Sequence, residues 1–129
     1  NVFGGAILKH IDMVAGIVAQ RYSQTNAVTV SMDKISFLKP VFVGNVLFVT
    51  ARVNYVQKSS MEIEVNVEAE DISKGTRVLT GNAFVTFVAL DANGKPAPVP
   101  QLRVENPEDQ KHFDEGKLRM EGRLKQRKN

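Results

Sequence analysis

The spacing of apolar residues near the start of the chain predicts one long helix. Between residues 6 and 19 only Lys9, His10 and Asp12 are polar, and no proline interrupts the run. A helix that is apolar most of the way round is typical of one enclosed by the rest of its protein. The pattern therefore predicts an enclosed helix over about residues 5–22, preceded by a turn at Gly4 and Gly5.

Four strand-like segments follow the helix, over about residues 27–38, 46–57, 61–71 and 77–90. The third is the clearest, because apolar residues alternate along it with glutamate and asparagine. Such an alternation, with a period of two residues and one face of the strand in water, is typical of an antiparallel sheet. The connections between the strands are short and carry no helix, which excludes a βαβ array. The pattern predicts an α+β fold in which an antiparallel sheet wraps around one long central helix.

The second of these segments is apolar on both of its faces. One face carries Leu47, Val49, Ala51, Val53 and Tyr55, and the other carries Val46, Phe48 and Val56. A strand that is apolar on both faces is covered on both faces. Because the helix can cover only one side, we expect a partner subunit to cover the other.

Two strands carry residues that interrupt their pattern. Gly81, inside the last strand, indicates a bulge or a close approach of another backbone. Asp33 and Lys34 break the alternation of the first strand, and a bulge or an intersubunit contact explains them better than catalysis does.

Composition narrows the possible chemistry. A chain of 129 residues, 43% hydrophobic and 24% charged, is typical of one soluble domain. The sequence has no secretory signal pattern and no apolar run near the ~20 residues of a membrane span, so a cytoplasmic location is expected. The absence of cysteine excludes disulfides, thiolate catalysis and cysteine-based zinc sites. With only His10 and His112 available, no metal site is expected.

The charge of the chain is uneven. The net charge is +3, yet the segment 117–129 holds lysines and arginines against a single glutamate, and the remainder is net negative. The segment has no aromatic residue to stack on bases and no nucleic-acid-binding motif. We expect residues 105–129 to form a charged, helical and solvated tail, or a frayed one. A segment that lies near a phosphate-rich ligand is the alternative.

Asp12 is the main candidate for chemistry. A carboxylate two turns into an enclosed apolar helix is costly to desolvate, so it should have a partner or a function. Lys9, at i−3, could instead form an ordinary surface ion pair with it. Gly16 and Ala19 favour the functional interpretation, because small residues leave room for a ligand or another backbone. Both interpretations stay open on these residues alone.

Several segments in one order carry a family resemblance. They are FGGAILKHID with VAGIVAQR, TVSMDKISFLKPVFVGN, KSSMEIEVNVEAE, GNAFVTFVALDANGKPAPVPQL and FDEGKLRMEGRLKQR. Together they resemble the hotdog-fold acyl-CoA thioesterases, above all the cytosolic, brain-type acyl-CoA hydrolases and then the short bacterial acyl-CoA thioesterases. The resemblance implies a hotdog domain over residues 1–104.

The resemblance also implies an activity and a site. Members hydrolyse fatty acyl-CoA to free fatty acid and CoA and need no cofactor, since coenzyme A is part of the substrate. It implies that Asp12 is the general base on water or, less often proposed, the nucleophile, and that Lys58, Ser59 and Ser60 lie near the CoA moiety. Relatives carry a first strand and a functional asparagine upstream of position 1, so we expect the sequence to begin inside its domain, or to be one of two tandem domains.

Thioester hydrolysis itself needs an activated water and donors for the developing oxyanion. Backbone N–H groups at Gly4 and Gly5 suit the second role, because the N-terminus of a helix favours negative charge. Asp12 lies seven residues further on, or roughly 10 Å at 1.5 Å per residue. One carbonyl cannot reach both groups, so we expect a site shared between two subunits, in a dimer and, as in relatives, a homohexamer of three dimers.

Two other function classes remain open. A hotdog dehydratase or hydratase on acyl thioesters would need a histidine beside an acid. His10 is expected on a different side of the helix from Asp12, and His112 lies in the charged tail and carries no signal. A non-catalytic acyl-CoA-binding module is the other alternative. No pattern in this sequence indicates the preferred length of the acyl chain or any regulation by nucleotides.

Overall fold

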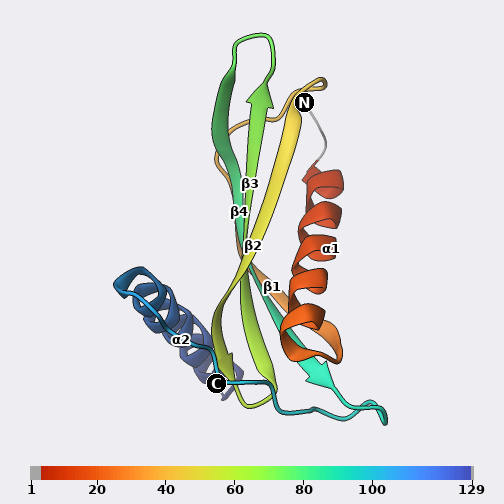
Figure 1. Ribbon diagram of the computed structural model, residues 1–129, viewed down its shortest axis with the longest axis vertical. Coiled ribbons are helices and arrows are strands. Elements are labelled where there is room, and N and C mark those ends of the chain that lie inside the picture. The colour runs from red at the N-terminus through yellow and green to blue at the C-terminus, as the bar shows by residue number, and fades with distance from the viewer. Residues whose placement is uncertain (1–3, 129) are drawn as a thin grey trace.

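The computed structural model describes residues 4–128, with side chains to residue 123. Its elements, in chain order, are α1 (Gly4–Ser23), β1 (Asn26–Phe37), β2 (Val46–Gln57), β3 (Ser60–Asp71), β4 (Thr76–Leu90) and α2 (Pro107–Lys128) (Figure 1). The predicted first helix and four strands are confirmed, each bound to within one residue. The glycine pair differs from expectation, because Gly4 and Gly5 are the first two residues of α1 rather than a turn before it.

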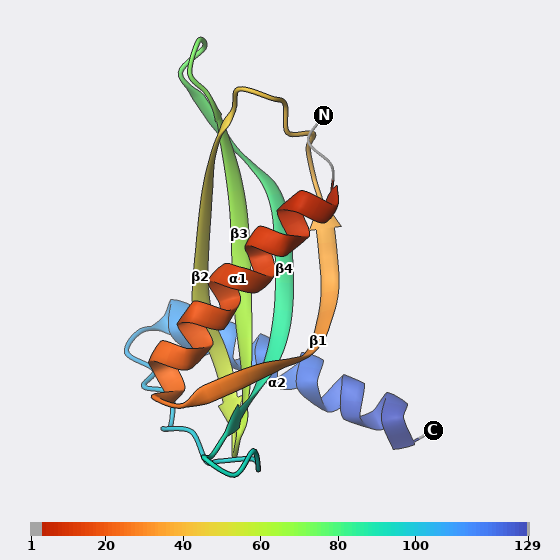
Figure 2. The same cartoon turned by 90° about the vertical axis from the view of Figure 1, so that its right-hand side faces the viewer.

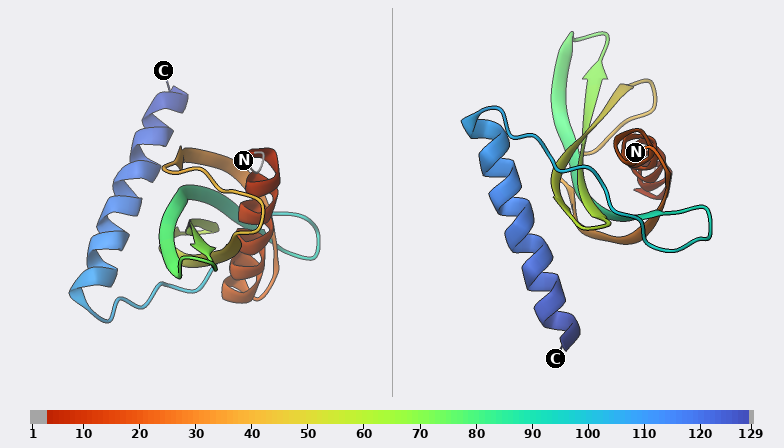
Figure 3. Two further views of the ribbon diagram at one scale, coloured as in Figure 1. Left: turned by 90° about the horizontal axis from the view of Figure 1, so that it is seen from above. Right: turned by 60° about the horizontal axis from the view of Figure 1, so that its bottom comes forward.

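The four strands form one antiparallel sheet in the order β1-β4-β3-β2. Helix α1 lies across one face of this sheet, and α2 lies on the opposite side (Figures 1 and 2). Seen along its length, the sheet curves about α1 (Figure 3). This is the predicted α+β arrangement of a sheet wrapped around one long helix.

The core lies between α1 and the sheet. Four residues of α1 spaced four apart are buried: Ile7, Ile11, Ala15 and Ala19. They pack against the buried apolar residues that alternate along β3 and β4, such as Val65 and Val85, both fully buried. One stripe of α1 is therefore enclosed, while Met13 and Ile17 on another side of the helix are 53% and 47% exposed. The prediction of a helix enclosed on all sides is wrong for the single chain.

The predicted irregularities at Gly81 and at Asp33 are both confirmed as bulges. Val67 pairs with Gly81 and Glu68 with Leu79, so Thr80 is the extra residue, and its hydroxyl donates to the Val67 carbonyl at 3.0 Å. In β1 the register shifts between Asp33 and Ser36, where Lys34 has a positive φ of 51°.

A third bulge, in β2, was not predicted and changes which side chains share a face. Val53 pairs with Ile63 but Tyr55 pairs with Glu62, so Asn54 is the extra residue. After this bulge Tyr55 faces α2, where its ring meets Phe113 at 4.8 Å between centroids. Val56 turns to the α1 side and packs against the core. The sequence-based assignment of Tyr55 and Val56 to faces is therefore wrong, because an extra residue inverts the alternation.

The expectation of a solvated tail is also wrong. Helix α2 packs against the outer face of the sheet, with Gly116 and Met120 buried. A Cβ added to Gly116 would stand 2.8 Å from the Cβ of Tyr55, so the helix backbone approaches β2 closely. Helix α2, not a partner subunit, thus covers the Tyr55 end of β2, whereas Val46 at the other end is 37% exposed. The division of the chain at residues 104 and 105 stays a prediction.

No helix among the described residues is long and apolar enough to cross a membrane.

Candidate functional site

Asp12 lies in the middle of α1, one residue after the buried Ile11, and its side chain is exposed in the single chain. The hydroxyl of Thr29 in β1 donates a hydrogen bond to Asp12 Oδ1 at 2.9 Å. Within the described part of the chain, no ion pair joins Lys9 to Asp12. The partner of this carboxylate is therefore a hydroxyl of the sheet and not the neighbouring lysine.

Thr29 was missed by sequence reasoning. It pairs with Phe87 of β4, whose side chain lies in the core, and this register turns the Thr29 hydroxyl toward α1. Its only signal in the sequence is a hydroxyl residue between the apolar Val28 and Val30. The contact itself depends on how β1 is placed against α1, which periodicity does not give.

The contact leaves the carboxylate suited to a base. One oxygen of Asp12 accepts the Thr29 hydroxyl, and among the described residues no group donates to the other oxygen, which can accept a proton from water.

Gly4 and Gly5 begin α1 at the end of the sheet where β1 finishes. The first N–H groups of a helix have no partner within the helix, so those of the opening turn can bind a ligand oxygen. A pocket of about 320 Å³ lies here, lined by Gly4, Ile7, Phe37, Leu38, Lys39, Pro40 and Val41. A Cβ added to Gly5 would meet no atom within 4 Å, so in the single chain the space beside it is open.

Lys58, Ser59 and Ser60 form the turn from β2 to β3. Lys58 has a positive φ of 54°, its carbonyl accepts from Val99 N at 2.8 Å, and that of Ser59 accepts from Ala89 N at 2.9 Å. The turn therefore has a fixed shape, but it stands at the opposite end of the sheet from Gly4 (Figure 1). One chain does not bring Gly4 and Gly5, Asp12 and this turn together.

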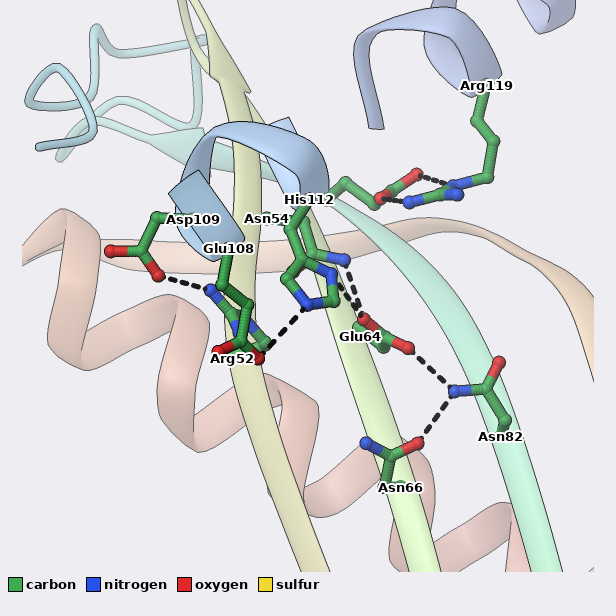
Figure 4. Close-up of polar contacts among 10 residues, drawn as sticks. Arg52, Asn54, Glu64, Asn66, Asn82, Glu108, Asp109, His112 and Arg119 are labelled. Carbon is green, nitrogen blue, oxygen red and sulfur yellow. Dashed lines mark hydrogen bonds and ion pairs between the residues drawn. The ribbon is translucent and has the colours of Figure 1, made fainter. Parts of the chain in front are cut away.

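The two histidines lie apart from Asp12. His10 is exposed on α1. His112 was expected to carry no functional signal, yet it lies on the side of α2 that faces the sheet, with Nδ1 3.4 Å from Glu64 Oε1 and Nε2 3.8 Å from Glu108 Oε1 (Figure 4). The sheet separates this cluster from α1, so His112 cannot serve Asp12 within the chain. Among the described residues, no group of three or more metal-ligating side chains is close enough to hold an ion.

Glu64 is the centre of the cluster on the outer face. Its two carboxylate oxygens accept from Asn54 Nδ2 at 2.9 Å and from Asn82 Nδ2 at 2.8 Å (Figure 4). Beside it, Arg119 of α2 forms two hydrogen bonds to Glu62, at 2.7 and 2.9 Å. Burial of Arg119 opposes its charged form, but the hydrogen bonds and negative charge of Glu62 outweigh burial and raise the Arg119 pKa. The cluster is a polar interface that joins α2 to the sheet, in which Asn54 Oδ1 is buried without a hydrogen-bond partner among the described residues.

The fold and the Asp12 site define a class. A strongly curved antiparallel sheet around one helix, with a carboxylate held in the middle of that helix, is the hotdog arrangement. The family model of the thioesterase superfamily matches residues 1–76, and the chain belongs to this superfamily.

Individual relatives agree with this family. The chain is 43% identical over 120 residues to the cytosolic acyl coenzyme A thioester hydrolase of Rattus norvegicus, covering 92% of the chain and 32% of that protein. It is 43% identical over 109 residues to an uncharacterized acyl-CoA thioester hydrolase of Bacillus subtilis, covering 84% of the chain and 63% of that protein. The chain thus spans about a third of the length of the rat protein.

Solved structures give the same fold. An acyl-CoA hydrolase from Bacillus cereus superposes with a TM-score of 0.91 at 37% identity, covering 97% of the chain and 76% of that structure. An apo-hexameric acyl-CoA thioesterase superposes with a TM-score of 0.91 at 35% identity, with coverages of 96% and 80%. An acyl-CoA hydrolase from Staphylococcus aureus, in complex with butyryl coenzyme A and coenzyme A, superposes with a TM-score of 0.88 at 36% identity. The match covers 97% of the chain and 76% of that structure. The hotdog fold expected from the resemblance is confirmed.

Proposed function

We propose that the protein to which this chain belongs hydrolyses fatty acyl-CoA to free fatty acid and CoA, with Asp12 as the general base. The observation that carries the proposal is the Asp12 carboxylate, oriented by the Thr29 hydroxyl at 2.9 Å and free at its second oxygen. The names of the rat and B. subtilis relatives support the reaction, and the acyl-CoA bound in the S. aureus hydrolase supports the substrate class.

The spacing of Asp12 and Thr29 adds support. The S. aureus hydrolase has been solved with an aspartate replaced by alanine and with a threonine replaced by alanine, and those two positions lie 17 residues apart. Asp12 and Thr29 are also separated by 17 positions. We therefore assign to this pair the part of the site that activates water, with Thr29 as a positioning residue.

The reaction proceeds by addition of water to the thioester. Asp12 accepts a proton as the water oxygen bonds to the carbonyl carbon, and N–H groups at Gly4 and Gly5 bind the oxyanion. When the oxyanion collapses, the carbon–sulfur bond breaks and the proton passes to the CoA sulfur. Atoms balance without a metal or other cofactor.

The two halves of the site come from two subunits in this proposal. Gly5 lies roughly 10 Å from Asp12 along α1, at 1.5 Å per residue. The open space beside Gly5 and the exposure of Asp12 suit a second copy whose α1 runs antiparallel to the first. The same arrangement brings the Lys58–Ser60 turn of one copy toward the Gly4 end of the other, where we propose that Lys58, Ser59 and Ser60 contact CoA.

Exposed apolar residues around Asp12 support the dimer. Met13 and Ile17 on α1 and Val28 and Val30 on β1 are each at least 41% exposed, and β1 is an edge strand. We propose that two sheets join edge to edge through β1, with an interface above the ~1,000 Å² of a biological contact. Structural relatives described as hexameric support three such dimers, which light scattering after size exclusion would measure as a homohexamer. The name of the rat relative supports a cytosolic location.

The alternatives are less well supported by the geometry. A dehydratase or hydratase would need a histidine beside the carboxylate, but Asp12 contacts Thr29, and His112 lies beyond the sheet. A non-catalytic acyl-CoA-binding module would bind acyl-CoA without turnover.

A thiol-release assay with acyl-CoA of short and long chains tests the proposal. Asp12→Ala should lose more than about nine-tenths of turnover while the oligomer persists, because general-base catalysis contributes about 10²–10⁴-fold. His10→Ala, two residues away and exposed, is the matched control and should keep its activity. If Asp12→Ala keeps a tenth or more of the wild-type rate, Asp12 is not the base.

A further inference from the structure

A bulge in β1 places two nearby hydroxyl residues on opposite faces of the sheet. In a regular strand, residues two apart point to the same face. Here Thr29 pairs with Phe87 and Ser31 pairs with Thr86, so Val30 is an extra residue between them. Thr29 consequently faces α1 and bonds Asp12, while Ser31 faces α2.

Helix α2 binds the outer side of this bulge through one side chain. Arg123 Nη1 lies 2.7 Å from Thr86 Oγ1 and 3.1 Å from Asp33 Oδ2, and it also contacts Ser31 Oγ. Ser31 directly follows the bulge on β1, Asp33 lies two residues further along the strand, and Thr86 is the β4 residue that pairs with Ser31. The Arg123 side chain is only 19% exposed, so its contacts with Ser31 and Thr86 are partly shielded from solvent, whereas the Asp33 side chain is 50% exposed.

Strand β1 needs such a constraint. Among the described strands it is the edge of the sheet and pairs only with β4. Its ladder is interrupted twice, between Thr29 and Ser31 and between Asp33 and Ser36, and a bulge leaves its extra residue without a ladder partner. Thr29 is the last residue of the regular ladder 26–29, and the extra residue Val30 directly follows it, so the ladder supports Thr29 from one side only. Arg123 contacts the segment between the two interruptions.

We propose that Arg123 is a positioning residue for Asp12. By holding Ser31 and Asp33 against β4, Arg123 fixes the bulge at Val30 and keeps the Thr29 hydroxyl in contact with the carboxylate across the sheet. The activity part of this inference rests on the proposed hydrolysis at Asp12, and the structural part does not.

A matched control separates this role from simple attachment of α2. Arg52 of β2 pairs with Asp109 of α2 at 2.9 Å, so this pair also ties α2 to the sheet, but at the strand farthest from β1. Arg52→Gln loosens α2 without touching the bulge. Arg123→Gln removes a tie of the same kind at the bulge itself, and Arg123→Lys restores the charge.

The test measures kcat and KM for acyl-CoA hydrolysis, together with the ¹³C carboxyl resonance of Asp12, assigned through Asp12→Asn. Arg123→Gln should lower kcat about tenfold with KM changed less than about twofold, the size expected for losing one hydrogen bond to a charged group. It should also move the Asp12 resonance. Arg123→Lys should recover part of kcat, and Arg52→Gln should change neither kcat nor the resonance. Equal effects of Arg123→Gln and Arg52→Gln would overturn the proposal.

A second variant covers the case in which Arg123→Gln fails to fold. Ser31→Ala removes an acceptor on β1 and leaves α2 intact, and it should move the Asp12 resonance in the same direction with a smaller fall in kcat. An unmoved resonance in Ser31→Ala would contradict the positioning role. If the wild-type protein does not hydrolyse acyl-CoA but the resonance moves as stated, the proposed function fails and the positioning role stands.

Discussion

The two faces of the sheet are held by different forces. Against α1 the sheet presents buried apolar residues, such as Val65 and Val85, which pack against the Ile7 to Ala19 stripe of the helix. Against α2 it presents mainly acidic and amide side chains, and ion pairs such as Arg119 with Glu62 accompany the ring contact of Tyr55 with Phe113. Burial of apolar surface is non-directional, whereas a hydrogen-bonded ion pair fixes one geometry.

The contrast between the two faces indicates that one mainly stabilises the fold and the other mainly fixes the positions of its elements. The apolar face should supply most of the free energy of folding, because area removed from water dominates it. The polar face should contribute less free energy and instead fix where α2 and the strands lie relative to one another.

Ile11→Ala should have the largest effect, since Ile11 is 1% exposed in the core. Removing its side chain leaves a cavity and should lower the free energy of unfolding by about 3 kcal/mol. Chemical denaturation measures the change. Leu118→Ala on α2, 68% exposed, is the control and should stay within about 0.5 kcal/mol of wild type. Similar losses for both would refute the central role of the apolar face.

Arg119→Met should cost about 2 kcal/mol, because the buried Glu62 carboxylate is then left without its hydrogen-bond donor. This loss of stability does not measure the net contribution of the ion pair, because it includes the penalty of leaving the Glu62 charge buried without a partner. The double variant Arg119→Met with Glu62→Leu should recover most of the loss, since apolar side chains can replace a buried ion pair. Equilibrium unfolding of both proteins tests this, and a double variant no more stable than the single one would mean that the pair itself contributes strongly to folding.

Gly116→Ala should cost about 1 kcal/mol. The new Cβ would stand 2.8 Å from the Cβ of Tyr55 and 3.0 Å from Glu62 Oε1, and overpacking should outweigh the ~1 kcal/mol gained in helix propensity. Gly122→Ala in the same helix meets no atom within 4 Å and should be stabilising. Thermal unfolding compares the two, and melting temperatures shifted in the same direction would contradict the close contact at Gly116.

Tyr55 should give the smallest effect, seen only at alkaline pH. Burial, and next the charge of Glu121, raise the pKa of Tyr55 above 10.0. Its contribution to stability is therefore present below pH 10 and lost as pH rises through the raised pKa. Tyr55→Phe should show a shallower alkaline loss of stability than wild type. Some loss should remain in the variant, because Tyr22, whose pKa is also raised by burial, still titrates there. Identical alkaline profiles would exclude Tyr55 as a contributor.

The fold was predictable from the sequence where periodicity determines it. The apolar run of α1 and the alternation of β3 gave elements with bounds within one residue, and Gly81 and Asp33 marked their bulges. The bulge at Asn54 was not predictable, because no glycine or charge interrupts the pattern there and one extra residue inverts every later side chain.

The site was predictable only in part. Asp12 stood out as a carboxylate in an apolar run, but its partner Thr29 lies on another element and is brought to it by tertiary packing. The docking of α2 was missed for a related reason, because the residues that face the sheet, such as Phe113 and Met120, are few among charged neighbours and do not stand out in the sequence. Its partners are single acidic residues such as Glu62 and Asp33, which look solvated in the sequence.

Co-expression of two inactive variants tests the central claim, a water-activating carboxylate from one subunit facing the α1 N-terminus of another. Asp12→Ala removes the base, and Gly5→Val crowds the open space beside the helix start. Random pairing makes half of the dimers mixed, each with one intact site, so thiol release should return to about a quarter of the wild-type rate. No recovery, with mixed oligomers verified by mass, would place the whole site within one chain and contradict a site shared between subunits.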